Sequence, residues 1–488
     1  MHYITPEDRH QFTFMQSLND LVSSEHYVRL IDVIVDEVVG ANKAQFCKKG
    51  KVFAGRKAYS PQTLLKLYIY GYLNGISSSR KLEKETQRNI EVIWLLGTLS
   101  PDHKTISDYR KDNGEEIKMV TRKFRQFLKD NGYIKGQTVA TDGTRVKANA
   151  KRSMLTEKKI HRRLEKLEIE LDEYLQRLSD NDIREDILEE LDEIGESGDI
   201  NEHLIDKIVE LQGKIEELQK HKEELRRRDV KQLSPSDPES KLMKSPDGKV
   251  PGYNVQLTVD AKHKMIADSE VVNEPADREL LDVMLDSLEE ELDIIPENAL
   301  GDKGFFSFTK IEKVEGNGKT KCFVPIPRQK GNDESLRFIY DEENDEFRCS
   351  EGKRLVLKHK NKSKRGQLLD VYQGKECEGC AIREKCTSSK YGRIIHRAHN
   401  EAWRQEYRKR LQSRSGKKMV ELRKCLVEHP IGTIRYWMGK IPLLLRGTIK
   451  VATEINLYTT AYNLRRLVSI ESFTDLREMI GNYNWAIA

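Results

Sequence analysis

The sequence predicts an α/β protein: a mixed sheet with a helical region before it and two insertions within it. Three observations lead to this prediction. Apolar residues recur at helical spacing in the first 130 residues, strand-length apolar segments alternate with helical ones from 138 to 327, and leucine heptads interrupt that alternation. At 488 residues the chain is too long for one compact core, so we expect several domains.

The first 130 residues are expected to form helices. Ser60 has the character of a helix N-cap and Pro61 that of a first helical residue, so a helix should follow. A second helix is expected near Lys81 to Leu96, ending at Gly97, and a third after Ser100-Pro101-Asp102. This order fits helix-turn-helix DNA binding, and it fits a plain helical bundle equally.

Five segments have strand character. They are residues 138–148 with Asp142-Gly143 at the strand end, 253–260, 265–272, 298–302 and 321–327. A helix over Asp277 to Leu292 is expected before the fourth strand, and another helix before the fifth. Without the insertion after the first strand, an antiparallel hairpin leads into parallel strands with helices between them. That order is typical of an RNase H-like core.

The segment from Leu155 to Val230 is acidic, with 14 Lys and Arg against 24 Asp and Glu. It holds two leucine-rich heptad series, which are Leu164, Leu167, Leu171, Leu175 and Leu178, and then Leu204, Ile208, Leu211, Ile215, Leu218 and Leu225. The series break near Gly195-Glu196-Ser197-Gly198. We expect an antiparallel helical hairpin that projects from the body, with a dimerisation coil as the alternative.

Charge and cysteine content limit the function classes. Residues 351–470 hold 28 Lys and Arg against 10 Asp and Glu, which indicates contact with nucleic acid or a solvated basic surface. Hydrophobic residues make up 37%, no apolar run approaches the roughly 18–20 residues of a membrane span, and the N-terminus lacks a signal-peptide pattern. Seven cysteines are too few and too scattered for a disulfide scaffold, so a cytoplasmic protein is expected.

Three carboxylates are candidates for a metal site. Asp142 and Asp302 follow predicted strands, and strand ends of an α/β sheet are where ligands gather. Glu428 is the candidate third ligand, because Lys424 and Arg435 share its face of an expected helix and would hold phosphate beside it. Phosphoryl transfer on nucleic acid uses two Mg²⁺ ions about 3.5–4 Å apart, held by such carboxylates.

Several blocks stand in a fixed order along the chain. They are Asp142-Gly143-Thr144-Arg145-Val146-Lys147-Ala148-Asn149-Ala150, Gly252 to Gln256, Gly301 to Phe305, Val427 to Trp437, Leu445 to Gly447 and Ala461 to Arg466. In this order they resemble bacterial insertion-sequence transposases of the DDE type. Around the glutamate, relatives often carry Tyr-x-x-Arg-x-x-x-Glu-x-x-x-x-x-x-Lys, where this chain has Glu421, Lys424 and Arg435 at the flanking positions.

The resemblance implies an RNase H-like enzyme that cuts element ends and joins them to target DNA. Asp142, Asp302 and Glu428 would be its catalytic, metal-binding triad, with two Mg²⁺ or Mn²⁺ ions as cofactors. Lys147, Lys424 and Arg435 would contact DNA phosphates. Its partners would be the terminal inverted repeats of the element, target DNA and further copies of the chain, as a homodimer or larger assembly on DNA.

Two other functions stay open at this point. One is a catalytically inactive DNA-binding protein derived from a transposase, and the other is a structural or regulatory coiled-coil protein. Glu454 is the second candidate for the third carboxylate, although residues 449–464 around it have the pattern of a packing helix.

The cysteines form a second motif. Cys349, Cys377, Cys380 and Cys386 have the spacing C-x27-C-x2-C-x5-C, which fits a structural zinc site or four reduced thiols in a small insertion. His396 and His399 are substitutes for one ligand. The other cysteines have the character of ordinary buried thiols, and they are Cys47, Cys322 and Cys425.

These patterns together give a domain organisation. The expected units are a helical DNA-binding domain over 1–130, a catalytic core over 131–152 and 241–328 with its C-terminal helices over 401–470, an acidic hairpin over 153–240, a cysteine-containing basic insertion over 329–400, and a tail over 471–488.

Overall fold

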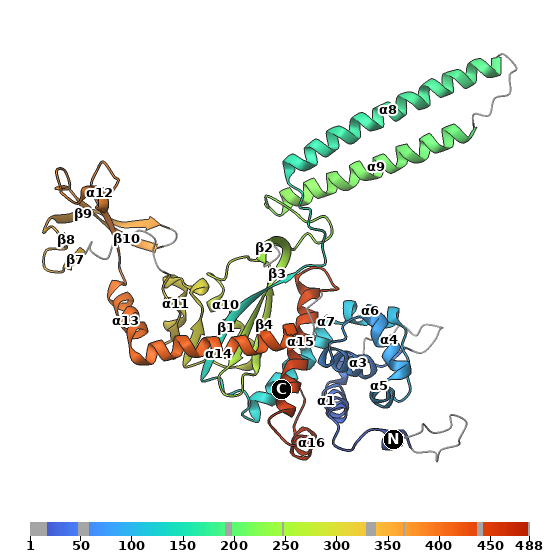
Figure 1. Ribbon diagram of the computed structural model, residues 1–488, viewed down its shortest axis with the longest axis horizontal. Helices are drawn as coiled ribbons and strands as arrows, with labels where there is room; N and C mark the ends of the chain where they lie inside the picture. Colours follow the sequence, from blue (N-terminus) through green and yellow to red (C-terminus); the bar gives the residue numbers. More distant parts are fainter. Residues whose placement is uncertain are drawn as a thin grey trace, which may run out of the picture.

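The computed structural model describes residues 17–46, 58–190, 198–245, 248–327, 338–364, 367–436 and 443–486. A mixed sheet with flanking helices lies at the centre, beside the N-terminal helices (Figure 1). A long helical hairpin projects on one side, and a small β-rich unit stands apart on the other. No helix in the described ranges has the length and apolar character needed to cross a membrane.

The N-terminal region is helical, as the sequence predicts. Its elements are the 3₁₀ turn η1 (Leu18–Leu21) and the helices α1 (Val28–Ala41), α2 (Lys43–Phe46), α3 (Pro61–Leu73), α4 (Ser79–Arg88), α5 (Ile90–Leu95), α6 (His103–Asp112) and α7 (Gly114–Asp130). The Ser60 side chain accepts the Thr63 N–H at 3.2 Å and caps α3, which confirms the expected helix start.

The helix expected over Lys81 to Leu96 is wrong as a single element. It is two helices, α4 and α5, which meet at Asn89. Asn89 adopts extended backbone, and its side chain accepts the Glu91 N–H at 3.0 Å to cap α5. Asparagine competes with helical hydrogen bonding in this way, so it ends one helix and starts the next. Asp102 caps α6 through the N–H groups of Lys104 and Thr105.

The six-stranded sheet is mixed. Its strands are β1 (Thr138–Lys147), β2 (Lys241–Ser245), β3 (Gly248–Asp260), β4 (Ile266–Val272), β5 (Asn298–Gly301) and β6 (Lys321–Phe323). The hydrogen-bonded order is β2-β3-β1-β5-β6, and β4 also pairs with β3. β1 runs antiparallel to β3 and parallel to β5, and β5 runs parallel to β6. The predicted mixed α/β architecture is therefore confirmed.

Several element boundaries differ from the sequence-based expectation: β3 begins at Gly248 and not at residue 253, and β6 ends at Phe323 and not at residue 327. β1 does not end at Asp142-Gly143 but continues to Lys147, because β3 pairs with it residue by residue as far as Gly252. The helix expected from Asp277 is α10, which spans Leu281–Leu292 and leaves Asp277 in the loop before it.

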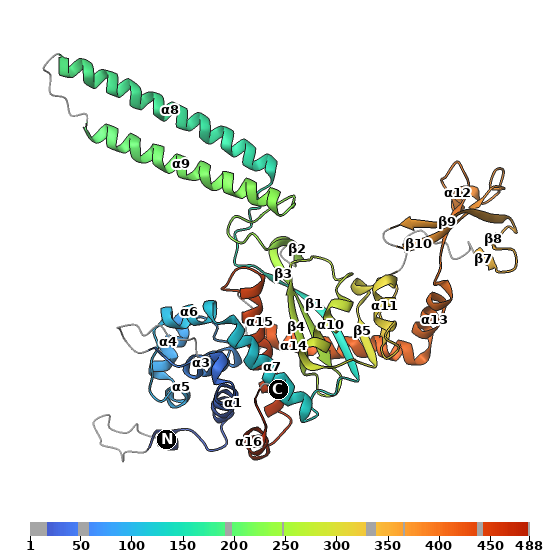
Figure 2. The same ribbon diagram turned by 180° about the vertical axis from the view of Figure 1, so that it is seen from behind.

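The remaining helices around the sheet and its neighbouring helices come from the second half of the chain. They are α10, the 3₁₀ turn η2 (Lys303–Phe305), α11 (Phe308–Glu315), α13 (Glu401–Gln412), α14 (Arg414–Tyr436), α15 (Thr448–Val468) and α16 (Phe473–Asn482). α14 contacts β1, β3 and β5, and α15 packs between β4 and the N-terminal helices α3 and α7 (Figures 1 and 2). A single hydrophobic core joins the N-terminal helices, the sheet and these C-terminal helices.

The acidic segment forms an antiparallel pair of helices, α8 (Glu157–Glu190) and α9 (Gly198–Arg227). Its own cluster of buried side chains includes the heptad residues Leu164, Ile215, Leu218 and Leu225. Of the expected helix break, residues 195–197 lie outside the described residues, and Gly198 begins α9. The two ends of this inserted segment meet at an isolated β-bridge, where Leu155 and Leu233 exchange backbone hydrogen bonds of 2.8 and 2.9 Å.

A second, five-stranded antiparallel sheet carries the cysteine motif. Its order is β11 (Ile394–Ala398), β10 (Gln367–Gly374), β9 (Arg354–Lys364), β8 (Glu346–Cys349) and β7 (Phe338–Asp341), and the short helix α12 (Arg383–Cys386) lies beside it. This unit, residues 338–398, is called the cysteine unit below. It is joined to α13 and stands off the central sheet (Figure 1).

Candidate active site

Asp142 lies on β1, and Asp302 directly follows the neighbouring parallel strand β5. In the β1–β5 pairing, Thr141 stands opposite Gly301, the last residue of β5, and each aspartate comes next in the chain. Because adjacent strands are about 4.8 Å apart, this register places the two carboxylates side by side. β5 ends at Gly301 whereas β1 continues, so Asp142 is the first residue of β1 without a β5 partner.

The Asp142 carboxylate is largely buried and has a cationic partner. Arg423 of α14 donates a hydrogen bond to Asp142 Oδ2 at 2.7 Å, and the Gly143 N–H donates to Oδ1 at 2.9 Å. Burial raises the pKa of Asp142 most, the Arg423 guanidinium opposes this rise, and the neighbouring charge of Asp302 adds to it. Two carboxylates that repel each other in a largely buried position favour a shared cation.

Asp302 occupies a tight turn. Its side chain accepts the Gly304 N–H at 2.6 Å and caps the short turn η2. A Cβ at Gly304 would lie 2.7 Å from Asp302 Oδ1 and 3.4 Å from Asp277 Oδ2. Glycine therefore leaves room between two carboxylates, which places Asp277 beside the pair as a third acidic side chain.

Asp277 is buried and fully partnered. Its Oδ1 accepts hydrogen bonds from the amide groups of Asn254 at 2.7 Å and Gln256 at 2.8 Å. Its Oδ2 forms an ion pair of 2.6 Å with Arg145. All three partners lie on β1 or β3, so Asp277 ties the loop before α10 to the two strands next to Asp142. We name this set, Arg145, Asn254, Gln256 and Asp277, the strand clamp.

Two buried oxygens of the strand clamp lack hydrogen-bond partners among the described residues. They are Asn254 Oδ1 and Gln256 Oε1. A Cβ at Gly143 would lie 2.8 Å from Asn254 Oδ1 and 2.7 Å from Asp277 Oδ1, so these polar atoms approach the backbone directly after Asp142. Buried acceptors without donors are rare in proteins and suit a hydrated cation nearby.

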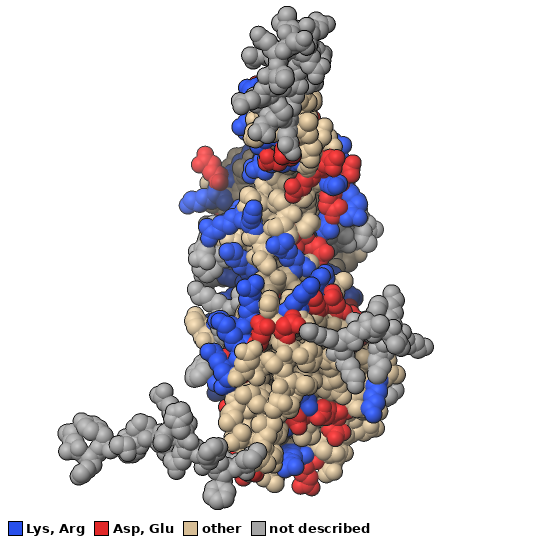
Figure 3. All heavy atoms as spheres, turned by 90° about the vertical axis from the view of Figure 1, so that its right-hand side faces the viewer, with Lys and Arg blue, Asp and Glu red and all other residues tan. Residues whose placement is uncertain are grey.

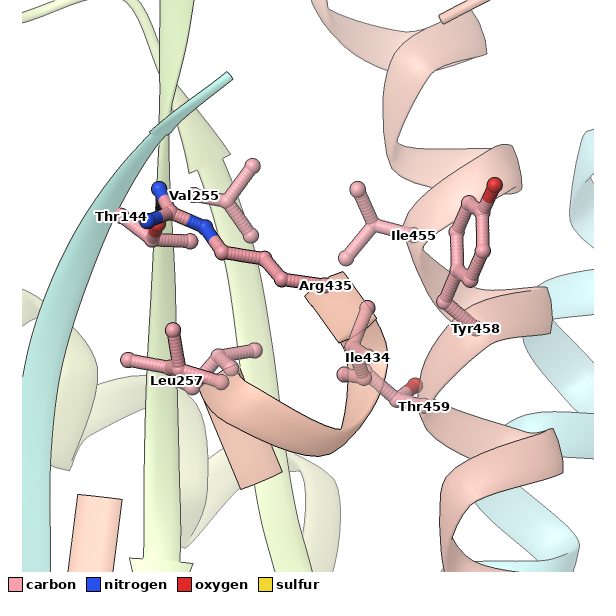
Figure 4. Close-up of a pocket in the computed structure, with 9 residues that line it drawn as sticks. Thr144, Val255, Leu257, Ile434, Arg435, Ile455, Tyr458 and Thr459 are labelled. Carbon is pink, nitrogen blue, oxygen red and sulfur yellow. Dashed lines mark hydrogen bonds between the residues drawn. The ribbon is translucent and has the colours of Figure 1, made fainter. Parts of the chain in front are cut away.

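Glu428 lies on α14, between two contacts that hold this helix to β1. Arg423 reaches Asp142 on one side of Glu428 in the sequence, and on the other side Arg435 donates a hydrogen bond to Thr144 Oγ1. Figure 4 shows the Arg435 side chain extending from α14 to Thr144 across an apolar hollow. Glu428 and Arg435 are seven residues apart and share a helix face.

The structure brings two of the three predicted carboxylates together, but it does not place the third in contact with them. Glu428 is exposed and forms no hydrogen bond or ion pair with Asp142 or Asp302 in the described residues. Over the same ranges, no three His, Cys, Asp or Glu side chains are already spaced to hold an ion. The cationic partner of Asp142 in this structure is Arg423, at 2.7 Å.

Glu454, the second candidate for the third carboxylate, lies elsewhere. It is 1% exposed on α15, accepts the Leu444 N–H at 3.0 Å and pairs with the buried Arg110 of α6 at 3.7 Å. Burial raises its pKa, and Arg110 opposes the rise. These contacts fasten α15 to the N-terminal helices and give Glu454 a packing role.

The candidate phosphate contacts differ in their surroundings. Lys147 and Lys424 are exposed, whereas the guanidinium of Arg435 is held by Thr144. Beside α14, a pocket of about 270 Å³ is lined by His429, Thr433, Tyr462, Arg465, Arg466 and Ser469. Figure 3 shows another side of the molecule, that of the N-terminal helices and the α8–α9 hairpin, and Lys and Arg side chains gather along one edge of that face. Cationic and hydroxyl groups of this kind are those that contact phosphate oxygens.

The four cysteines of the motif line one pocket of the cysteine unit. Cys349 ends β8, Cys377 and Cys380 lie in the loop after β10, and Cys386 ends α12. His396 and His399 do not line the pocket, and His399 lies 3.3 Å from Asp370 instead. Of the other three cysteines, Cys322 is buried as expected, Cys425 is exposed against expectation, and Cys47 lies outside the described residues.

Sequence reasoning missed the strand clamp and Arg423. Asn254 and Gln256 belong to a block that was noticed only for its resemblance, and Asp277 stands just before the leucines of α10, where an acidic residue has the character of a helix start. The available signal for Arg423 was its position on the apolar stripe of α14, three and four residues before the buried Leu426 and Val427. A charged residue on such a stripe needs a buried partner.

Comparison with protein families gives two matches. Residues 16–112 match the transposase domain DUF772, and residues 348–468 match a transposase DDE domain. The second match includes the four motif cysteines and Glu428. Searches of curated proteins and of solved structures find no match.

Both matched domains belong to transposases. The first match covers most of the N-terminal helical region, and the second covers most of the cysteine unit together with α13, α14 and α15. The chain is therefore a transposase, with an N-terminal DUF772 transposase domain and a C-terminal DDE transposase domain.

Proposed function

We propose that this transposase cuts DNA at the ends of its own element and joins the cut ends to target DNA by metal-dependent phosphoryl transfer. The observation that carries the proposal is the β1–β5 register, which sets Asp142 and Asp302 side by side beneath α14. Asp142, Asp302 and Glu428 would be the catalytic triad, with Glu428 supplied by α14.

The strand order supports an RNase H-like core. A central strand that is antiparallel to one neighbour and parallel to the other, with helices in the parallel connections, is the arrangement that the sequence order predicts. The helical insertion α8–α9 and the cysteine unit would interrupt this core. Residues 1–130 would bind element-end DNA, and 131–152, 241–328 and 401–470 would form the catalytic core.

The donor set at the paired aspartates fits Mg²⁺ or Mn²⁺. Carboxylate oxygens are the ligands that these hard cations prefer, and the amide oxygens of Asn254 and Gln256 are acceptors suited to their hydration shell. When bound there, a pair of such ions would stabilise the charge on the attacking and leaving oxygens of the phosphoryl group.

The chain's own residues would position the DNA. Arg423 would exchange its contact with Asp142 for a phosphate oxygen once a cation takes over that carboxylate. Arg435, tied to Thr144, would hold α14 against β1 and keep Glu428 at a fixed height above the sheet. Lys147, Lys424 and the pocket beside α14 would contact the DNA backbone, which fixes position and carries no sequence choice.

The test uses the full chain and a DNA duplex with the element's end sequence. With Mg²⁺ present we expect strand cleavage and joining, and with EDTA neither. Asp142→Asn, Asp302→Asn and Glu428→Gln should each abolish both reactions while DNA affinity stays within about two-fold. Glu406→Gln, an exposed residue of α13, is the matched control and should retain full activity.

The outcomes separate this proposal from an inactive DNA-binding descendant of a transposase. Specific binding without Mg²⁺-dependent cleavage in the wild-type protein would establish the inactive form. Cleavage that survives Asp302→Asn would refute the assigned metal site even if the protein is an active transposase.

A further inference from the structure

We infer that Cys349, Cys377, Cys380 and Cys386 form a structural zinc site that holds the cysteine unit together. The inference stands apart from the proposed DNA cleavage, because these residues lie in a separate sheet and need no part in the reaction. It rests on how the four thiols are placed, on the turns that carry them and on the composition of the unit around them.

The four thiols converge from three places in the chain. They line a single pocket of about 20 Å³, which has room for one ion and not for an organic ligand. No disulfide joins any of the described cysteines, so all four thiols are available as ligands. Four sulfurs around one small space supply the complete ligand set of a Cys₄ structural zinc site.

Glycines in the left-handed conformation shape the turns beside the ligands. Gly352 has φ of +72° in the turn that follows Cys349, and its N–H donates to the Cys349 carbonyl at 2.9 Å. Gly379 has φ of +71° between Cys377 and Cys380. Each glycine therefore lets the backbone curl back at a thiol, and the second turn brings the two thiols of the CxxC motif to the same pocket.

The backbone closes tightly around the Cys377 sulfur. A Cβ at Gly374 would lie 2.8 Å from Cys377 Sγ, and a Cβ at Gly392 would lie 3.2 Å from it. The Arg393 N–H donates to the same sulfur at 3.5 Å. The position of the Cys377 sulfur is therefore fixed by the backbone on both sides of it.

Positive charge surrounds the pocket. Lys353, Arg354, Arg383 and Arg393 all line it along with the four cysteines. A zinc ion with four thiolates carries a net charge of about −2, so cations at its rim lower the free energy of the bound state.

The cysteine unit has little apolar core of its own. Its buried apolar residues are Leu355, Leu369, Val371, Tyr372 and Ala398, and none of them belongs to either large hydrophobic cluster of the described chain. Units of this size usually need a metal or disulfides to fold. Among the described residues, no three of these sulfur atoms lie close enough together to coordinate one ion. Zinc binding would therefore require the cysteine side chains to rotate toward the ion.

The experiment measures metal in the full-length protein, purified under reducing conditions without chelator. Elemental analysis should find about one zinc per chain, the content of one four-ligand site. Cys377→Ser and Cys386→Ser should each lower the zinc content at least five-fold. Cys425→Ser removes an exposed thiol from α14 and is the matched control, which should keep the full zinc content.

A second measurement does not depend on any variant being folded. A strong chelator should remove zinc from the wild-type protein, make residues 338–398 sensitive to limited proteolysis and leave the central sheet resistant. Wild-type protein without zinc, whose four motif thiols react at once with a thiol reagent and whose cysteine unit resists protease, would overturn the inference. The inference would also be overturned if Cys425→Ser lost as much zinc as Cys377→Ser and Cys386→Ser. DNA cleavage is not a readout in either arm.

Discussion

Arg423 and Asp142 form an ion pair of 2.7 Å between α14 and β1, at the position where the proposed metal site needs a free carboxylate. The arginine therefore offsets the charge of Asp142 and fastens to the sheet the helix that carries Glu428.

The first prediction concerns Arg423 itself. Arg423→Gln should destabilise the metal-free protein by about 1–3 kcal/mol, because Asp142 loses a charged hydrogen-bond partner and keeps Asp302 as its neighbour. Mg²⁺ should then raise the melting temperature more in the variant than in the wild type. The check is thermal unfolding with and without Mg²⁺, with Arg414→Gln, an exposed residue of α14, as the control. Equal Mg²⁺ gains in all three proteins would contradict it.

The second prediction concerns the strand clamp. Asp277→Asn removes the ion pair with Arg145 but keeps the side-chain volume. Residues that orient metal ligands typically change activity about 10–100-fold when replaced, so cleavage should fall by that factor. The Mg²⁺ concentration for half-maximal rate should rise as well, which a purely structural role would not cause. Asp286→Asn breaks the exposed 3.0 Å ion pair with Lys313 and should change neither quantity.

The third prediction separates Glu454 from Glu428. Glu454→Gln leaves the buried Arg110 without its anionic partner, which should lower the free energy of unfolding by about 3–5 kcal/mol. Cleavage per folded molecule should stay near that of the wild type. Glu428→Gln should abolish cleavage and leave the free energy of unfolding near that of the wild type, because the Glu428 side chain is exposed. Activity assays and chemical unfolding of both variants decide between the two carboxylates, and the reverse pattern would make Glu454 the third ligand.

The fourth prediction is a pH dependence at Glu270 of β4. Burial raises the pKa of Glu270 above 4.5, and the nearby charge of Asp268 adds to the rise. The folded state then holds its proton more tightly than the unfolded state, so this group makes stability fall as pH rises from 4.5 through the folded pKa. Glu270→Gln should be more stable than wild type at pH 7, and the difference should vanish below pH 4.

The control for this titration is Glu289→Gln, an exposed residue of α10. Its unfolding free energy should follow the wild-type pH curve throughout. Chemical unfolding from pH 3.5 to 8 measures all three proteins, and a Glu270→Gln gain that persists unchanged at acid pH would contradict the assigned cause.

The fifth prediction concerns the basic surface. If residues 351–470 follow the DNA backbone, the logarithm of affinity should fall linearly with the logarithm of salt concentration. Lys424→Ala should reduce that slope by about 1 and weaken binding to all sequences alike. Lys158→Ala on the acidic hairpin should leave the slope unchanged. Affinity that does not respond to salt would exclude backbone contact by this segment.

Local patterns in the sequence predict much of the fold. The Ser60-Pro61 start of α3, the β3–β4 hairpin and the strand before Asp302 all depend on residues close together in the chain, and the structure has each of them. The neighbouring placement of Asp142 and Asp302 follows once two strands are taken to be parallel and in register.

The parts that sequence reasoning missed depend on contacts between distant segments. Asp277 is kept out of α10 because Asn254 and Arg145 bind the backbone of the preceding loop at Glu274 and Pro275, and no local pattern shows this. Arg423 is distinguishable from Lys424 only when the helix is already placed against β1, since one residue along a helix turns a side chain by 100°. The break at Asn89 is local, and its capping side chain was the available signal.

The Leu155–Leu233 bridge allows the α8–α9 hairpin to vary in length without affecting the rest of the fold. The chain enters and leaves the hairpin at this bridge, close to the central sheet. A change in the length of α8 and α9 therefore does not alter how the strands of the sheet pair. Seven residues advance a helix by about 10 Å, so gain or loss of one heptad in each arm moves the tip by that step with little rotation. The length of the arm can therefore change in steps of one heptad while the aspartate pair stays where it is.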